Sequence, residues 1–142
     1  LEGLKARQLN LELTHGKYVP ILIKIAPDLT KGEVLSIADS LLKAKMDGVI
    51  ATNTTLDRTP VQGHEHAEEA GGLSGAVLTQ KSLELTETLA KALDGKLPII
   101  GVGGISNAED ARARLNAGAT LLQVYSSFIY QGPPLIKELV NA

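Results

Sequence analysis

The sequence contains no cysteine and no tryptophan, and its only aromatic residues apart from histidine are three tyrosines and one phenylalanine. Without cysteine, disulfides and thiolate metal sites are excluded within these 142 residues, and a reducing compartment is weakly favoured. No apolar run approaches the roughly 20 residues of a membrane span, and no signal peptide opens the sequence. We therefore expect this chain to be soluble.

An excess of charge of either sign is also missing. The net charge is -2, from 14 basic and 16 acidic residues, so no basic surface for nucleic acid is expected. The hydrophobic content of 44% is typical of a globular protein, and 142 residues fit a single domain.

Four short apolar segments rich in β-branched residues predict strands. Their nearly continuous apolarity is typical of strands buried on both faces of a parallel sheet. The segments are residues 19–26, 47–52, 97–103 and 119–125.

Amphipathic segments between these strands predict helices. Apolar residues recur at helical spacing in 34–42 and 85–93, a third helix is predicted at 107–117, and a fourth from Pro133. A further helix is expected within residues 1–14.

Helix ends are marked by their own residue patterns. The pairs Thr30 with Glu33 and Ser106 with Glu109 have the spacing of a capping box. Gly95 and Gly118 stand where a helix would end in a left-handed residue.

Repeated βα units predict an α/β fold with a parallel sheet. A doubly wound open sheet fits this length, whereas a (β/α)₈ barrel needs about 250 residues. We favour the carboxyl-terminal half of a TIM barrel, because a helix with no strand before it indicates a chain that starts inside a larger fold. Residues 1–142 would then be a single partial domain, with a lid-like loop at about 55–79.

Glycines and hydroxyl groups follow the last two predicted strands. Gly103-Gly104 and Tyr125-Ser126-Ser127 stand where barrels commonly bind phosphate through backbone N–H groups, with Ser126 to Gly132 as a short extra helix. Alternatively, the glycines permit a tight turn and the serines cap a helix. Their joint occurrence at successive strand ends favours phosphate, and the spacing is not the G-x-G-x-x-G dinucleotide pattern.

Polar residues also mark the first two strand ends. Lys24 lies inside an apolar strand, so we expect it to be desolvated or paired with an anionic ligand, unless it points outward between helices. Residues 52–55, TNTT, are suited to orienting a small polar substrate, or they form a capped turn.

His64 and His66 have a spacing that could bind a metal ion, but we interpret them as exposed and expect no metal site.

Five ordered motifs together resemble the quinone-dependent, membrane-associated class of dihydroorotate dehydrogenase. They are KIAPDLT, DGVIATNTTLDR, GGLSGAVL, LPIIGVGGI and LLQVYSSFIYQGPPLIKEL, and they span nearly the whole chain. The resemblance implies a flavin-dependent TIM barrel that oxidises dihydroorotate to orotate in pyrimidine biosynthesis and passes the electrons from FMN to a quinone.

The resemblance also implies roles for individual residues. Lys24 and Thr52 would contact the flavin, and Asn53 and Thr54 the orotate. The backbone at Gly75 and Gly104 would approach FMN. Tyr125 and Ser126 would lie at its phosphate.

Members of this class carry further parts that do not align with these residues. An amino-terminal membrane-associating segment, four barrel strands and a catalytic serine base are expected upstream of Leu1, so neither Ser74 nor Ser126 is assigned as the base. The isolated chain is expected to lack activity and to self-associate. The parent would lie on the cytoplasmic face of the bacterial inner membrane, or on the mitochondrial inner membrane in a eukaryote. Another FMN- or phosphate-binding barrel enzyme, or a non-catalytic half-barrel module, remains the alternative.

Overall fold

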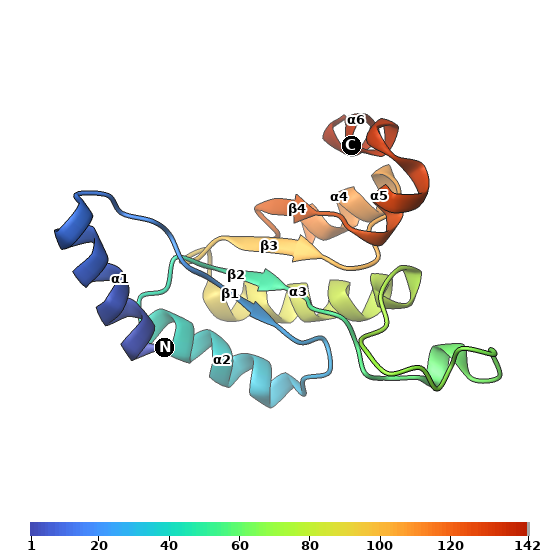
Figure 1. Cartoon of the computed structure of the whole chain (residues 1–142), viewed down its shortest axis with the longest axis horizontal. Helices are drawn as coiled ribbons and strands as arrows, with labels where there is room; N and C mark the ends of the chain where they lie inside the picture. Colours follow the sequence, from blue (N-terminus) through green and yellow to red (C-terminus); the bar gives the residue numbers. More distant parts are fainter. Residues whose placement is uncertain (142) are drawn as a thin grey trace.

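The computed structural model describes residues 1–141 and shows alternating strands and helices (Figure 1). The strands are β1 (Leu22–Ile25), β2 (Gly48–Ala51), β3 (Ile99–Val102) and β4 (Leu121–Gln123). The helices are α1 (Glu2–His15), α2 (Lys31–Lys43), α3 (Thr79–Leu93), α4 (Ala108–Asn116), α5 (Ser126–Gln131) and α6 (Pro133–Val140). Two single-turn 3₁₀ helices, η1 (Thr59–Val61) and η2 (Ala76–Leu78), lie in the connection between β2 and α3.

The strands form a parallel sheet in the order β1-β2-β3-β4, as the repeated βα units predict. All the arrows in Figure 1 point toward one end of the sheet, and the long connection after β2 and helix α5 lie at that end. The carboxyl ends of the strands are therefore the place at which to look for a site.

One face of the sheet carries the core. Apolar residues of α2 and α3 pack against strand residues that alternate along β1, β2 and β3, because every second side chain of a strand points to the same face. This core contains Ile25, Val49, Ala51 and Ile99 from strands, and Val34, Ala38, Leu41, Leu85, Leu89 and Leu93 from helices.

The other face of the sheet has little cover. Lys24, Ile50 and Ile100 are aligned across β1, β2 and β3, and Leu121 continues the row on β4. Lys24 is exposed, Ile50 and Ile100 are half-buried, and the Leu121 side chain is 59% exposed. Within residues 1–141 the helices therefore cover one face of the sheet and leave the other open.

Several element ends differ from the sequence-based predictions. The strands begin up to three residues later and end up to two residues earlier than predicted, because only their central residues pair with a neighbour. The capping box of Thr30 and Glu33 is confirmed, with Thr30 Oγ1 accepting from Glu33 N at 3.3 Å. The capping box of Ser106 and Glu109 is wrong: Asn107 is the N-cap and accepts from Asp110 N at 2.9 Å. Asp110 in turn accepts from Ser106.

Both predicted glycine helix ends have positive φ. Gly118 (φ 106°) follows α4, and Gly95 (φ 70°) follows α3. The first left-handed residue after α3 is nevertheless Asp94, at φ 49°, so Gly95 continues that turn and does not begin it.

Helix α1 is fixed to the rest of the fold by Asp47, just before β2. Its carboxylate accepts hydrogen bonds from Ile21 N (2.7 Å), Gln8 Nε2 (2.6 Å), Lys5 Nζ (3.2 Å) and the Tyr18 hydroxyl. Burial would raise the pKa of Asp47, but these bonds, that from the Ile21 N–H foremost, hold it well below its ordinary value of 3.8. One carboxylate thus joins α1, the segment before β1 and the start of β2.

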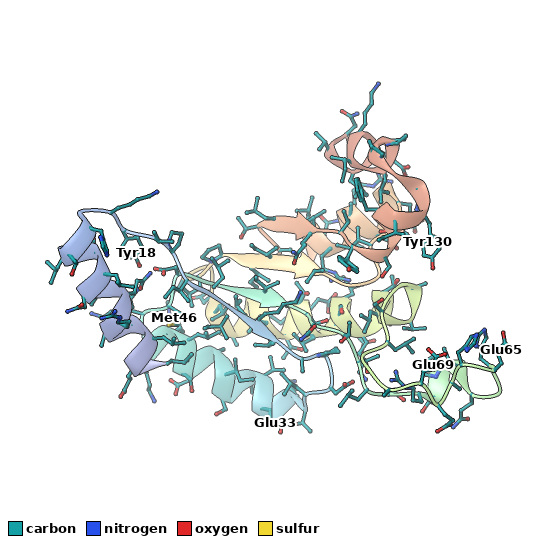
Figure 2. The ribbon with its side chains drawn as sticks, in the orientation of Figure 1. Tyr18, Glu33, Met46, Glu65, Glu69 and Tyr130 are labelled. Carbon is teal, nitrogen blue, oxygen red and sulfur yellow. The ribbon has the colours of Figure 1, made fainter. Side chains whose placement is uncertain are left out.

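The connection from residue 52 to 75 reaches away from the sheet (Figure 1). An antiparallel bridge between Thr55 and Leu73 closes its base, and Figure 2 shows Glu65 and Glu69 at its far end. Arg58 donates to the Glu69 and Gly71 carbonyls across the loop. Whether the loop acts as a lid stays a prediction.

Among residues 1–141, no helix is both long and apolar enough to cross a membrane.

Candidate functional site at the carboxyl ends of the strands

A cavity of about 290 Å³ lies beyond the ends of β3 and β4. Three segments that are distant in sequence form its wall: the glycine loop after β3, the residues between β4 and α5, and the end of the long connection. Its lining includes Gly75, Gly103, Gly104, Ser106, Tyr125, Ser126, Ser127 and Gln131. The Gly103-Gly104 pair and the Tyr125-Ser126-Ser127 segment, which follow successive strands, therefore line the same cavity, and phosphate binding there stays a prediction.

The glycine loop requires glycine for steric reasons. Gly103 (φ 102°) and Gly104 (φ 68°) both adopt left-handed backbone conformations. A Cβ atom at Gly104 would lie 2.3 Å from the backbone nitrogen of Thr79, and one at Gly103 would lie 2.8 Å from Ser82 Oγ. The loop therefore packs against the start of α3 at a distance that only glycine permits.

Backbone N–H groups at the cavity wall remain available for a ligand. Among the described residues, Gly104, Ile105, Ser126 and Ser127 have no recorded acceptor for their backbone N–H groups. The side chain of Ser127 donates to the Ile105 carbonyl, and Gln131 Nε2 donates to the Ser106 carbonyl at 2.9 Å. These two contacts hold α5 against the glycine loop.

A buried arginine lies beneath the glycine loop, and the sequence reasoning missed it. Arg114 of α4 is 1% exposed. Its guanidinium donates to the carbonyl oxygens of Val102 (3.1 Å), Gly103 (2.9 Å) and Thr79 (3.3 Å). The available signal was helical spacing: Arg114 follows the fully buried Ala111 by three residues and therefore shares its inward face.

Lys24 is not desolvated in this chain, so that part of the expectation is wrong, whereas its pairing with an anionic ligand stays a prediction. The side chain is exposed, and no hydrogen bond or ion pair to it is recorded within residues 1–141. The physical reason is its position on β1: it alternates with Ile23 and Ile25, which lie on the helix side. Lys24 therefore lies on the uncovered face of the sheet and not between helices.

The TNTT segment divides between two environments. Thr52 is buried, and its hydroxyl lies 2.8 Å from Ser82 Oγ of α3. Asn53 is exposed and its Oδ1 accepts from Thr54 N at 2.9 Å, which is the local bond expected of a capped turn. Only Asn53 and the half-buried Thr54 thus remain accessible to a small molecule.

Thr55 takes part in a polar cluster at the base of the long connection. The Asp28 carboxylate accepts from Thr55 Oγ1, from Lys81 Nζ of α3 and, at 2.8 Å, from Leu56 N. Burial would raise the pKa of Asp28, but the bonds from Lys81 and Thr55 outweigh burial and lower it. Asp28 therefore fixes where the segment after β2 leaves the sheet.

The two histidines of the long connection are exposed, as predicted. Their ring centroids lie 5.5 Å apart, and His66 contacts Glu65 and Glu69. These residues are remote from the cavity, whose lining includes Tyr130 of α5 (Figure 2). Residues 1–141 contain no cluster of three potential metal ligands.

The strand order β1-β2-β3-β4 follows the chain without the reversal of a doubly wound sheet, so this chain has the fold of part of a (β/α)₈ barrel. The chain belongs to the dihydroorotate dehydrogenase family, whose model matches residues 4–142.

Similar proteins of known name support this assignment. The chain is 61% identical over 142 residues to a dihydroorotate dehydrogenase (quinone) of Pseudoalteromonas atlantica, and 57% identical over 141 residues to one of Klebsiella pneumoniae subsp. pneumoniae. The matches cover 100% and 99% of this chain, but only 42% of each relative. The chain therefore spans less than half the length of these relatives.

Solved structures of the same family share the fold. The dihydroorotate dehydrogenase of Eimeria tenella in complex with ferulenol matches with a TM-score of 0.82 and 40% identity, over 88% of this chain and 33% of that one. Its ligand-free form matches with a TM-score of 0.79 and 41% identity, over 84% and 33% of the two chains.

Proposed function

We propose that this chain is the carboxyl-terminal half of a quinone-dependent dihydroorotate dehydrogenase. The complete protein, meaning the full-length polypeptide that carries this chain, would oxidise dihydroorotate to orotate in pyrimidine biosynthesis and pass the electrons through FMN to a quinone. The observation that carries the proposal is the 61% identity, over the whole chain, to a relative named for this activity and for quinone. The same identity favours this function over another phosphate-binding barrel enzyme or a non-catalytic module.

The residues at the cavity fit a flavin nucleotide. A phosphate group needs several N–H donors and close approach of the backbone, and the wall offers unpaired N–H groups at Gly104 and Ser126 beside glycines that carry no Cβ. We assign Gly75 and Gly104 to backbone contact with FMN, and Tyr125 and Ser126 to its phosphate. FMN, when bound, supplies the electron-accepting ring system that no side chain provides.

The remaining assigned residues lie at the ends of β1 and β2. The Lys24 ammonium would stabilise negative charge on the reduced flavin, and its place on the uncovered face of the sheet, which faces the interior of a complete barrel, supports that role. Thr52 would contact the flavin through its carbonyl oxygen, because its hydroxyl is already paired with Ser82 and its backbone N–H with the Val102 carbonyl. Asn53 and Thr54 would bind orotate through the groups that remain accessible.

We assign the general base for dihydroorotate oxidation to a part of the complete protein that lies outside these 142 residues. The resemblance implies a serine on a loop upstream of Leu1. Neither Ser74 nor Ser126 is assigned this role, and their hydroxyl oxygens lie 2.9 Å apart, within hydrogen-bond distance. Membrane association and the quinone site are also proposed for the upstream part of the complete protein.

The test is to purify the complete protein and measure its absorbance spectrum and its reaction with dihydroorotate. We expect bound FMN, and bleaching of the flavin absorbance by dihydroorotate that a quinone reverses. A colourless protein would contradict the flavin assignment. A flavoprotein that dihydroorotate leaves oxidised would favour a different barrel enzyme.

A further inference from the structure

We propose that Arg114 is a positioning residue that orients the Gly103-Gly104 loop to bind the phosphate of the flavin nucleotide. This inference rests on the proposed function, because it assumes that a phosphate group enters the cavity. Arg114 itself does not line the cavity; it acts through the loop above it.

The guanidinium joins three pieces of backbone that have to stay in register. Val102 is the last residue of β3, Gly103 opens the glycine loop, and Thr79 is the first residue of α3. Their carbonyl oxygens accept from Arg114 at 3.1, 2.9 and 3.3 Å, respectively. A planar group with several fixed N–H directions can hold three acceptors at once, whereas a lysine ammonium at the end of a flexible stem holds them less well.

These bonds also determine where the loop N–H groups point. In a trans peptide the N–H points away from the C=O of the same peptide plane. The carbonyl of Gly103 is directed toward Arg114, so the N–H of Gly104, in the same plane, is directed away from Arg114. Gly104 lines the cavity, and its N–H has no recorded acceptor within residues 1–141. Arg114 thus presents this donor to a ligand.

Arg114 forms no ion pair within the described part of the chain, although the charge of Asp110 raises its pKa against the effect of burial. No ion pair with a carboxylate is recorded for it, and Asp110, one turn earlier, is engaged with Ser106 through a carboxylate oxygen. Burial lowers the pKa of Arg114 to about 10, so the group is still cationic at neutral pH. A buried cation that donates to carbonyl oxygens and has no carboxylate within ion-pair distance, the charge of Asp110 acting on it only from farther away, favours an anion on the other side of a thin glycine loop.

The sheet makes room for this arginine. A Cβ atom at Gly101 would lie 2.5 Å from Arg114 Cγ and 3.1 Å from the Cβ of Ala119. The glycine in the middle of β3 therefore accommodates the arginine stem where it crosses from α4 to the loop. This explains a glycine that a buried strand would otherwise disfavour.

The test compares FMN with riboflavin, which has the same ring system but no phosphate. Affinities are measured by fluorescence quenching for the apo form of the complete protein and for Arg114→Met. We expect Arg114→Met to weaken FMN binding by about tenfold or more and riboflavin binding by less than about threefold. The preference for FMN over riboflavin should therefore fall. Arg112→Met is the matched control, since Arg112 lies on the same helix and is exposed. The preference of this variant for FMN over riboflavin should equal that of the wild type.

The outcomes distinguish a role of Arg114 in phosphate binding from a general role in folding. Equal loss of both ligands in Arg114→Met would overturn the proposal, because it would show a general structural role, and so would an unchanged preference. If Arg114→Met does not fold, Arg114→Lys decides, with an expected fall in the preference of at least about threefold and no fall as the contradicting result. A wild-type protein that binds neither flavin would instead refute the proposed function.

Discussion

The hydroxyl oxygens of Ser74 and Ser126 lie 2.9 Å apart, although 52 residues separate them in the chain. Ser74 lies near the end of the long connection after β2, and Ser126 is the first residue of α5. The contact joins that connection to the cavity rim, where Gly75 and Ser126 both line the wall. The hydroxyl pair therefore holds the long connection against the start of α5 beside the cavity.

Removal of this contact should make the cavity easier to leave. In the complete protein, we expect Ser74→Ala to raise the FMN dissociation rate by about two- to fivefold, the loss of one neutral hydrogen bond. The rate is measured by the fluorescence that FMN regains on release. Ser36→Ala, an exposed change on α2, should leave the rate unchanged. Equal rates in the wild type and Ser74→Ala would show that this contact does not restrain the loop.

Loss of the Lys24 charge should affect the chemical step. Lys24→Met in the complete protein is expected to slow flavin reduction by dihydroorotate about 10²-fold, because the charge that stabilises the reduced flavin is gone. Rapid-mixing absorbance of the flavin measures this rate. Lys91→Met, an exposed change on α3, serves as the control. An unchanged reduction rate would mean that Lys24 does not face the flavin.

Asn53 should act on the substrate and not on the cofactor. Its side chain is exposed at the end of β2. We expect Asn53→Ala to weaken orotate binding by about tenfold while FMN stays bound, because polar groups of the substrate lose a partner. Titration of orotate against the flavin spectrum gives the affinity. Loss of FMN together with orotate would assign Asn53 to the cofactor site or to folding.

The order of strands and helices was predictable because it depends on local periodicity. The four strands and the helices between them follow apolar spacing, and the capping box at Thr30 needs only residues 30–33. The meeting of Gly103-Gly104 with Ser126 was also predictable, since carboxyl ends of neighbouring parallel strands share one edge of the sheet.

The environment of individual polar residues was not predictable in the same way. Arginine is a surface residue in most helices, and helical spacing alone does not show that the inward face of α4 lies under the glycine loop, so the place of Arg114 was not predictable. The pairing of Thr52 with Ser82 spans 30 residues and depends on how α3 packs against β2. The exposure of Lys24 depends on which face of the sheet α2 and α3 cover.

Acid should weaken the attachment of α1 through Asp47. Its pKa in the folded state lies below the ordinary value of 3.8, so the stability it contributes is present above that pH and is lost as the pH falls below it. In the complete protein, Asp47→Asn should cost about 2 kcal/mol at pH 6, because hydrogen bonds to a charged group are replaced by neutral ones. This difference from the wild type should shrink toward pH 3. Urea unfolding at both pH values gives the two differences.

Asp39→Asn is the matched control for this prediction. Asp39 is 58% exposed and pairs with Lys43 one turn away on α2, so its replacement should change the free energy of unfolding by less than about 0.5 kcal/mol at either pH. A difference between Asp47→Asn and the wild type that stays constant from pH 6 to pH 3 would contradict the assigned pKa shift.

The isolated 142-residue chain should self-associate. Its sheet has two edge strands, β1 and β4, and its uncovered face presents the 59% exposed Leu121 beside Ile50 and Ile100. Open edges and apolar faces both recruit other chains, because association pairs free backbone groups and removes apolar area from water. Two copies could cover each other's open faces as the two halves of a barrel do. Light scattering gives the mass, and a monomer near 15.0 kDa would contradict this expectation.

A charge on the uncovered face separates the two causes of association. Leu121→Lys should shift the isolated chain toward monomer if the apolar face drives association, whereas Leu13→Lys, at an 86% exposed position on α1, should not. Equal association in both variants would assign the effect to the strand edges.

Neither the oligomer nor the monomer should oxidise dihydroorotate in a dye-reduction assay, because the serine base is assigned to an upstream loop that no copy contains. Turnover by the isolated chain would place the base within these residues and refute that assignment.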